Sequence, residues 1–196
     1  MKHILVELQR ISRLLLKGKR LSHVESCVNF AVQLASIHGV NEDQVKIASF
    51  AHDIFRDLEP SILIKMASAY KVKVTRLEKL NPILLHGKVA AEYVRRRFYI
   101  DDKEILEAIA YHTSGKENFG DVGKIVFLSD SLEENRIYEN VELLRQMAKQ
   151  DLNHALYLVV ANKILYAVKR RLFVLPETVK MWNWLVQLRK EDSAWN

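Results

Sequence analysis

The chain has 196 residues, of which 49% are apolar and 28% are charged, an ordinary composition for a globular domain that can bury one well-filled core. The single cysteine, Cys27, excludes an intrachain disulfide and a cage of thiolate ligands around a metal, and we interpret it as a small core residue. With only 6 Gly and 3 Pro, the composition argues against a sheet protein with many tight turns and favours helices.

Residues 1–19 form a predicted amphipathic helix that we expect to pack on a domain formed by residues 20–196. Charged side chains interrupt its apolar positions, so it lacks the continuous apolar centre of a signal peptide. The alternative is that residues 1–18 bind a membrane surface. The most apolar later run, ALYLVVANKILYAV, is too short to span a membrane and contains Asn162 and Lys163. We therefore expect a cytoplasmic protein without a membrane partner.

Helical periodicity covers most of the remaining chain, and we find no alternating strand pattern, internal repeat or low-complexity linker. The sequence therefore predicts a single all-α domain, a helical bundle. The predicted helices occupy, in chain order, about residues 20–38, a segment opened by Asn41, a short segment after Pro60, residues 82–98, residues 102–112, residues 121–134, about 140–149, about 151–170, and a segment after Pro176.

Residue types at the expected helix ends support these boundaries. Gly39 follows the first of these helices at the position that favours a left-handed backbone. Asn41, with Gln44 three residues later, is typical of a capping box. Either Asp101 or Asp102 is expected to cap the helix that follows them.

The net charge of +6 arises largely from clusters of Lys and Arg at residues 17–20, 95–97 and 169–171. A basic surface is compatible with a nucleic acid, an anionic membrane or a small polyphosphate ligand. Because all three clusters lie near expected helix ends, we interpret them as favourable partners of helix dipoles and as solubilising groups.

The stretch SFAHDIFRDL places His52 and Asp53 side by side within an apolar run. Burying an unpaired imidazole or carboxylate is costly, so such groups are normally paired or coordinate a metal. Four further titratable residues lie where an apolar helical stripe would otherwise continue or stop: His23, His86, His112 and Asp130. If these helices share an inward face, the six side chains form one mixed set of nitrogen and oxygen ligands.

Such a ligand set suits borderline divalent metals such as Fe, Mn, Co or Zn. Six ligands exceed what one open catalytic site needs, and a carboxylate can bridge two ions; Asp53 is the natural bridge because its neighbour His52 also points inward. A centre with two ions about 3.5–4 Å apart can hold a hydroxide poised for in-line attack on phosphorus. We interpret the remaining histidines as structural: His3, His38 and His154.

The order His23, His52-Asp53, His86, His112, Asp130 resembles the HD-domain metal phosphohydrolases, and more narrowly the bacterial YqeK-type symmetrical dinucleoside tetraphosphatases. The resemblance covers about residues 20–184. The segments that carry it are HVESCVNFAVQLASIHGVNEDQVKIASFAHDI, NPILLHGKVAAEYV, IAYHTSGKENFG, KIVFLSDSLEENR and DLNHALYLVVANKILYAV. Of these, LLHG, YHTSG and SD…EENR are more discriminating than the His-Asp pair alone.

The resemblance implies a helical HD-domain fold around a buried centre of two metal ions, most often iron in this family. It also implies that diadenosine tetraphosphate, a small nucleotide, is split into two ADP molecules by attack of a metal-bound hydroxide on phosphorus. One implied metal is held by His23, His52, Asp53 and Asp130, and the second by Asp53, His86 and His112.

Polar residues beside these ligands are candidates for binding the phosphates of the substrate. Lys88, Thr113, Ser114 and Arg136 are the expected substrate-binding residues, and Arg56 and Lys88 join Asp53 as expected catalytic residues. Two departures from the family pattern concern Arg56, where related sequences often have Lys, and the SDSLEEN segment, in which Ser129 and Glu134 replace commoner residues. Neither departure touches an implied ligand.

Three alternatives stay open on the sequence. An HD-domain phosphohydrolase could act on another nucleotide, such as a nucleoside triphosphate or a guanosine polyphosphate. A basic module could bind RNA or protein and use the metal site only for structure, although we expect no nucleic-acid partner. The oligomeric state, a homodimer included, is left open.

Overall fold

The computed structural model describes residues 1–191, and over this range the chain forms eleven α-helices, one short 3₁₀ helix and no strands. The all-α prediction is confirmed. The helices are α1 (Lys2–Leu15), α2 (Lys19–His38), α3 (Glu42–Ala51), α4 (Pro60–Ala69), α5 (Arg76–Leu80), the 3₁₀ helix η1 (Pro82–Leu85), α6 (His86–Phe98), α7 (Lys103–Tyr111), α8 (Asp121–Leu132), α9 (Val141–Gln150), α10 (Leu152–Lys169) and α11 (Pro176–Glu191).

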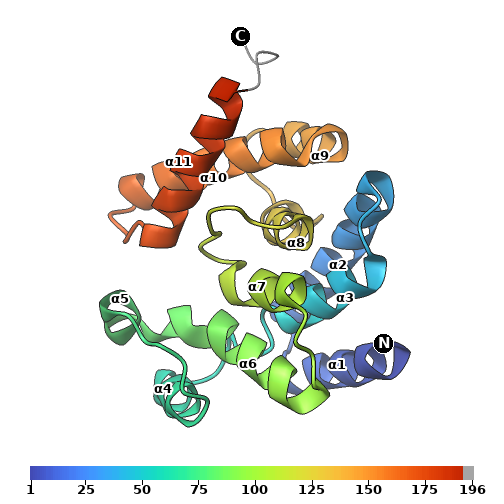
Figure 1. Cartoon of the computed structure of the whole chain (residues 1–196), viewed down its shortest axis with the longest axis vertical. Helices are drawn as coiled ribbons and strands as arrows, with labels where there is room; N and C mark the ends of the chain where they lie inside the picture. Colours follow the sequence, from blue (N-terminus) through green and yellow to red (C-terminus); the bar gives the residue numbers. More distant parts are fainter. Residues whose placement is uncertain (192–196) are drawn as a thin grey trace.

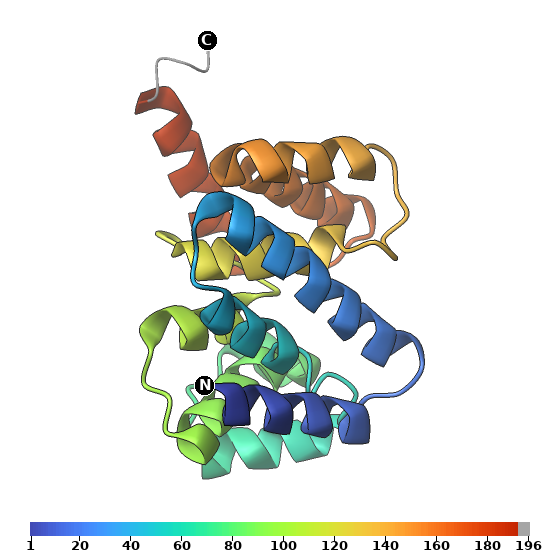
Figure 2. The ribbon, with the colours of Figure 1, turned by 90° about the vertical axis from the view of Figure 1, so that its right-hand side faces the viewer.

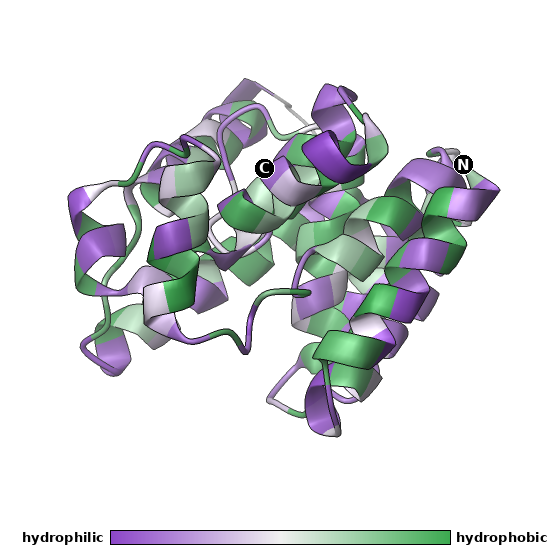
Figure 3. Cartoon of the chain, turned by 90° about the horizontal axis from the view of Figure 1, so that it is seen from below, coloured by the Kyte–Doolittle hydropathy of each residue, from purple (hydrophilic) through white to green (hydrophobic). Residues whose placement is uncertain are grey.

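The helices form one domain in which α2 and α3 pack beside α7 and α8 (Figure 1). The layer of α9, α10 and α11 covers α8 on one side, whereas α1, α4 and α6 lie toward the opposite end (Figure 2). Hydrophobic and hydrophilic residues share most helices (Figure 3), as expected for amphipathic helices around a common core. The largest fully buried side chains are contributed by helices far apart in the sequence, among them Leu34, Ile47, Ile109 and Phe127.

Helix α1 packs against α3. Leu8 is fully buried, and the Ser12 hydroxyl, which bonds to the Leu8 carbonyl, also reaches the carbonyl of Phe50 at 3.2 Å. Burial of one such leucine contributes about 1.5–3 kcal/mol relative to leaving it exposed. Within residues 1–191, no helix is both long and apolar enough to cross a membrane.

The predicted helix ends are largely correct, with corrections in the capping interactions. Gly39 ends α2 with a left-handed backbone, at φ +67°. Asn41 accepts hydrogen bonds from two backbone N–H groups of α3, but the Gln44 side chain donates to Asp102 at 2.6 Å, so the predicted capping box is wrong in its second half. The cap of α7 is Asp102, not Asp101.

Two short elements between residues 70 and 86 were not resolved by periodicity. Helix α5 has only five residues, too few to show a helical stripe, and Thr75 caps it in a reciprocal box with Glu78. The single helix predicted from Pro82 is instead the 3₁₀ turn η1 followed by α6, which begins at His86. This junction makes His86 the first residue of α6, where its side chain can turn toward the protein centre.

The interpretation of the basic clusters is correct for two of them. Residues 95–97 lie in the last turn of α6, and Lys169 lies in the last turn of α10, where positive charge is favourable. It is wrong for Lys19 and Arg20, which lie in the first turn of α2, where the free N–H groups already carry partial positive charge. Lys17 instead follows the C-cap residue of α1, Leu16, where positive charge is favourable.

Candidate active site

Three of the predicted ligand histidines lie at helix ends and use the same local hydrogen bond. His52 ends α3, His86 begins α6 and His112 ends α7. Each Nδ1 lies close to a backbone carbonyl oxygen three residues earlier: that of Ser49 for His52 at 2.7 Å, of Ile83 for His86 at 2.5 Å and of Ile109 for His112 at 2.8 Å. Because a carbonyl only accepts, Nδ1 carries the proton and Nε2 is left with a free lone pair.

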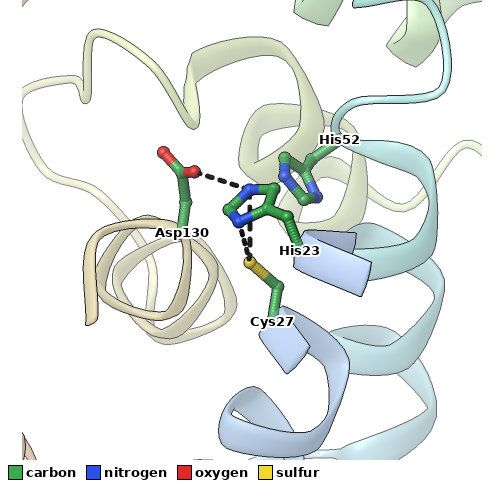
Figure 4. Close-up of side chains that lie close together, drawn as sticks. All are labelled: His23, Cys27, His52 and Asp130. Atoms are coloured by element: carbon green, nitrogen blue, oxygen red, sulfur yellow. Dashed lines mark hydrogen bonds and ion pairs between the residues drawn. The ribbon is translucent and has the colours of Figure 1, made fainter. Parts of the chain in front are cut away.

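His23, on α2, is oriented by a carboxylate. Its Nδ1 lies 3.0 Å from Oε1 of the buried Glu133, and its Nε2 lies 3.1 Å from Oδ1 of Asp130 on α8. Figure 4 shows the His23 ring between Asp130 and Cys27, with His52 beside it. A carboxylate behind a histidine ring is a frequent support of metal ligands. Glu133 was not predicted, although it lies within the SD…EENR segment.

Asp53 lies between the four histidines, and its two oxygens face different pairs of rings. Oδ1 lies 3.1 Å from Nε2 of His86 and 3.5 Å from Nε2 of His112. Oδ2 lies 3.8 Å from Nε2 of His52 and 3.9 Å from Nε2 of His23. All six predicted ligand residues therefore meet at one place, although they come from segments spread over more than half of the chain.

Burial keeps two of these rings neutral. Burial lowers the pKa of His52 to about 4, and its Nε2 has no hydrogen-bond partner. Burial likewise lowers the pKa of His86. A neutral imidazole with a free Nε2 lone pair is the form that binds metals.

The donor set fits a metal ion. Nε2 of His86 and Nε2 of His112 lie 3.0 Å apart, and with Asp53 Oδ1 they bring three acceptor atoms together. Two ligands about 2.1 Å from an ion and at right angles to each other are about 3.0 Å apart, which is the spacing found here. The described chain contains two groups of residues whose ligand atoms all lie within 4.8 Å of one another inside each group. One group is His23, Cys27, His52 and Asp130, and the other is His52, Asp53 and His112. The cluster can therefore hold metal.

The spacing of His86 and His112 depends on Gly87. A Cβ at this position would lie 2.8 Å from the carbonyl oxygen of Ile109 and 3.1 Å from Cε1 of His112. Only glycine therefore allows α6 to approach the end of α7 closely enough for the two rings to meet. The LLHG segment carries this requirement, but its reason becomes visible only in three dimensions.

Cavities adjoin the cluster at both ends. A wide cavity of about 840 Å³, which we call the α2 cavity, is lined by Lys17, Gly18, Lys19, Arg20, Ser22, His23, Asp57, Glu133, Asn135 and Arg136. A smaller cavity of about 210 Å³, the Lys88 cavity, is lined by Thr75, Arg76, Glu78, Lys88, Thr113, Ser114, Pro176 and their neighbours. It shares Thr75, Lys88, Ala110, Tyr111 and Glu177 with a further cavity of about 530 Å³.

The structure places three of the predicted substrate-binding residues in the Lys88 cavity. Lys88 Nζ lies 2.6 Å from Oε1 of Glu78, and Thr113 Oγ1 lies 3.0 Å from Nε2 of His112. The Ser114 hydroxyl donates to the carbonyl of Gly115, so it is already engaged within its own loop. Of these side chains, Thr113 makes the most direct contact with the cluster.

Arg136 and Arg56 differ in their relation to the cluster. Arg136 lines the α2 cavity, and its Nη2 lies 3.1 Å from Asp130 Oδ1. In the described part of the chain, the Arg56 side chain makes no hydrogen bond or ion pair with the cluster. Arg20 does so instead, with Nη1 2.8 Å from Asp53 Oδ2. Arg20 was overlooked as a site residue, and its position three residues before His23 was the available signal.

Two more residues near Asp130 were not predicted. Lys163 Nζ lies 3.8 Å from Asp130 Oδ2 and 4.2 Å from the centre of the Phe127 ring. Cys27 is buried, as expected of a core residue, but its Sγ also lies 3.5 Å from Nε2 of His23. The side of the cluster near Asp130 is therefore more crowded than the sequence indicates.

Comparison with known proteins agrees with this geometry. The family model described as HD domain matches residues 20–135. The chain is 33% identical over 167 residues to the symmetrical bis(5'-nucleosyl)-tetraphosphatase of Bacillus subtilis (strain 168), a match that covers 85% of this chain and 89% of that protein. A protein of the same name from Halalkalibacterium halodurans is 32% identical, with 87% and 91% of the two chains covered.

A solved structure supports the same assignment. The crystal structure of a protein from Clostridium acetobutylicum, described as a predicted HD superfamily hydrolase involved in NAD metabolism, matches with a TM-score of 0.88 and 27% identity. The match covers 93% of this chain and 96% of that chain. The chain therefore belongs to the HD-domain family, and to the same protein family as the bacterial symmetrical bis(5'-nucleosyl)-tetraphosphatases, as its motifs predicted.

Proposed function

We propose that the protein is a metal-dependent hydrolase that splits diadenosine tetraphosphate symmetrically into two ADP molecules. The names of its relatives support this substrate. The observation that carries the proposal is the convergence of four histidine Nε2 atoms on the two oxygens of Asp53, with all four Nδ1 atoms engaged by other groups.

The proposed ligands fall into two sets that share Asp53. His23, His52, Asp53 and Asp130 would hold one ion, and Asp53, His86 and His112 would hold the second. Iron is the metal that the resemblance favours, while the donor types also suit Mn, Co or Zn. When bound, the ions supply positive charge beside the scissile phosphate and activate a water molecule as the nucleophile.

The chain's own residues would position the substrate and accommodate its charge. Water attacks one of the two central phosphorus atoms, the bond from that atom to the central bridging oxygen breaks, and the second ADP leaves with this oxygen. Lys88 and Arg136 carry positive charge at the two cavities beside the cluster, where the negative charge of the leaving diphosphate develops. Thr113 is placed beside His112 to donate to a phosphate oxygen.

Arg20 joins these residues in the proposal because it contacts Asp53 directly. Its guanidinium can hold the carboxylate in place or bind a phosphate oxygen bidentately. Arg56 stays a prediction, since in the described chain no contact ties its side chain to the cluster.

Metal analysis of anaerobically purified protein, coupled to chromatography of the reaction products, tests the proposal. The expected result is about two metal ions per chain, as the two ligand sets imply, and ADP as the sole product from diadenosine tetraphosphate. A panel of nucleoside triphosphates and guanosine polyphosphates tests the rival phosphohydrolase activity. Faster turnover of one of these would overturn the proposed substrate. Binding of RNA in a filter assay without metal-dependent turnover would instead support a binding module.

A further inference from the structure

Positive charge is concentrated around the start of α2, and part of it has no acidic partner in the described chain. Lys17, Lys19 and Arg20 flank an N-cap residue, Gly18, that has no side chain to accept a hydrogen bond, and the first turn contains no acidic residue. The positive charges of Lys19 and Arg20 oppose the dipole of α2, whereas Lys17 also follows the end of α1, where positive charge is favourable. A local arrangement that costs stability without a structural gain is typical of a functional site.

The same residues line the α2 cavity together with Arg136. The arginines have acidic partners in the cavity region, because Arg20 pairs with Asp53 and Asp57 and Arg136 pairs with Asp130. In contrast, within residues 1–191 neither Lys17 nor Lys19 makes a side-chain hydrogen bond or ion pair, and both are exposed. The two lysines are therefore available to an anion.

The position and size of the α2 cavity restrict the kind of anion that can bind there. His23, a proposed metal ligand, lines the cavity wall. The volume of about 840 Å³ falls within the range of about 300–1,000 Å³ that holds small-molecule ligands. An anion bound there would extend from the proposed metal centre toward the lysines, as the phosphates of a nucleotide would.

The substrate chemistry calls for separate phosphate sites at the two ends of the centre. Symmetrical cleavage leaves two phosphates on each side of the broken bond, so each half needs its own cations. The α2 cavity adjoins His23, and the Lys88 cavity adjoins His112 through Thr113; the two cavities share no lining residue. Lys88 serves one half, and the start of α2 is placed to serve the other.

We infer that the α2 cavity holds one ADP half of the substrate by its phosphates, with Lys17 and Lys19 as phosphate-binding residues. This inference rests on the proposed function for its substrate. Lys17 and Lys19 make no hydrogen bond or ion pair with Asp53 or any other proposed ligand in the described chain, so their removal tests phosphate binding separately from metal content.

The test uses the double variant Lys17→Ala/Lys19→Ala in the full, metal-loaded protein. We expect unchanged metal content, nearly unchanged kcat, and a KM for diadenosine tetraphosphate raised about tenfold, because two charge-assisted contacts to phosphate are lost. In calorimetry with ADP and Mn²⁺, the binding step that belongs to the α2 cavity should weaken by about the same factor, while binding in the Lys88 cavity stays unchanged. The matched control is Lys2→Ala/Lys65→Ala, which removes the same charge from exposed positions outside these cavities.

The outcomes separate this inference from the proposed function. If the wild-type protein cleaves the tetraphosphate and the two double variants behave alike, the inference is overturned and the proposed function stands. If the wild-type protein does not cleave it but ADP binding weakens only in Lys17→Ala/Lys19→Ala, the phosphate site is supported and the proposed function fails. ADP binding that is equal in all three proteins would also overturn the inference.

Discussion

Nε2 of His86 and Nε2 of His112 lie 3.0 Å apart, although both rings already bond through Nδ1 to backbone carbonyls. Two lone pairs that face each other in a buried site repel, and the nearby Asp53 carboxylate adds negative charge. A cation held by these groups, as proposed above, would remove this conflict. We therefore expect the arrangement to be more stable with metal than without it.

Stripping the metal with a chelator should lower the thermal unfolding midpoint. A ligand present at 100 times its Kd stabilises the folded state by about 2.7 kcal/mol, and for a chain of this size each kcal/mol corresponds to about 2–4 °C. Thermal denaturation of stripped and reloaded protein, with metal content measured in both samples, checks this. If the stripped and the reloaded protein unfolded at the same midpoint although only the reloaded sample contained metal, the proposed ion site would be contradicted.

Asp53→Ala should lose both metals and all turnover. Among residues 1–191, Asp53 is the one side chain whose oxygens face both sets of histidines, so no other described residue can substitute for it. Metal analysis and an activity assay on the purified variant test this, with Asp101→Ala as the control because Asp101 is highly exposed and lies outside the cluster. A variant that kept full metal content would show that the shared role of Asp53 is wrong.

Gly87→Ala should destabilise the protein and empty the His86–His112 half of the site. At an exposed position inside a helix, the change from Gly to Ala raises the free energy of unfolding by about 1 kcal/mol. A decrease on Gly87→Ala would therefore reveal a steric clash. Here the added Cβ meets a backbone carbonyl oxygen at 2.8 Å, which cannot move without displacing α7. Urea denaturation and metal stoichiometry test the prediction, and a stability gain with full metal content would contradict it.

Lys88→Met, combined with Glu78→Gln, should keep the metals and weaken substrate use. Removing Lys88 alone would leave the buried Glu78 carboxylate without its partner, so the paired change separates phosphate binding from stability. We expect a KM increase of about tenfold with metal content unchanged. Glu78→Gln alone is the control that keeps the lysine. Steady-state kinetics identical to those of the control would rule out a phosphate role for Lys88.

His38→Ala serves as a negative control among the histidines. Nε2 of His38 lies 2.7 Å from the carbonyl oxygen of Ala148 and links the end of α2 to α9, away from the cluster. Losing this bond should cost about 1 kcal/mol of stability while metal content and kcat stay near the wild-type values. Denaturation and kinetics measured on the same preparation test both halves of the prediction. A large loss of metal would place His38 in the site after all.

Much of the fold and the meeting of six predicted ligands could be read from the sequence, for a physical reason. Helical periodicity and caps are local, and a titratable side chain inside an apolar run must have a partner. His52 and Asp53 fulfil this expectation, because both are buried and face the other histidines. Their role as metal ligands remains the proposal made above.

What the sequence did not reveal depends on the approach of distant segments. Arg20, in α2, contacts Asp53, which follows α3. Gly87 is required only because α6 packs closely against the end of α7. The charges of residues 17–20 were visible, but whether each residue follows α1 or lies in the first turn of α2 decides whether a helix dipole favours it. The answer depends on a shift of one or two residues in where α2 begins, and helix boundaries are the part of a sequence-based prediction with the largest error.

The recurring bond from a histidine Nδ1 to the carbonyl three residues earlier ties the proposed metal centre to the backbone. A bound ion that pulled on one of these rings would also tighten the last turn of α3 or α7, because that turn supplies the acceptor. Amide protons in these two turns should therefore exchange with solvent more slowly once the site is filled. Hydrogen exchange would then report metal occupancy without an activity assay.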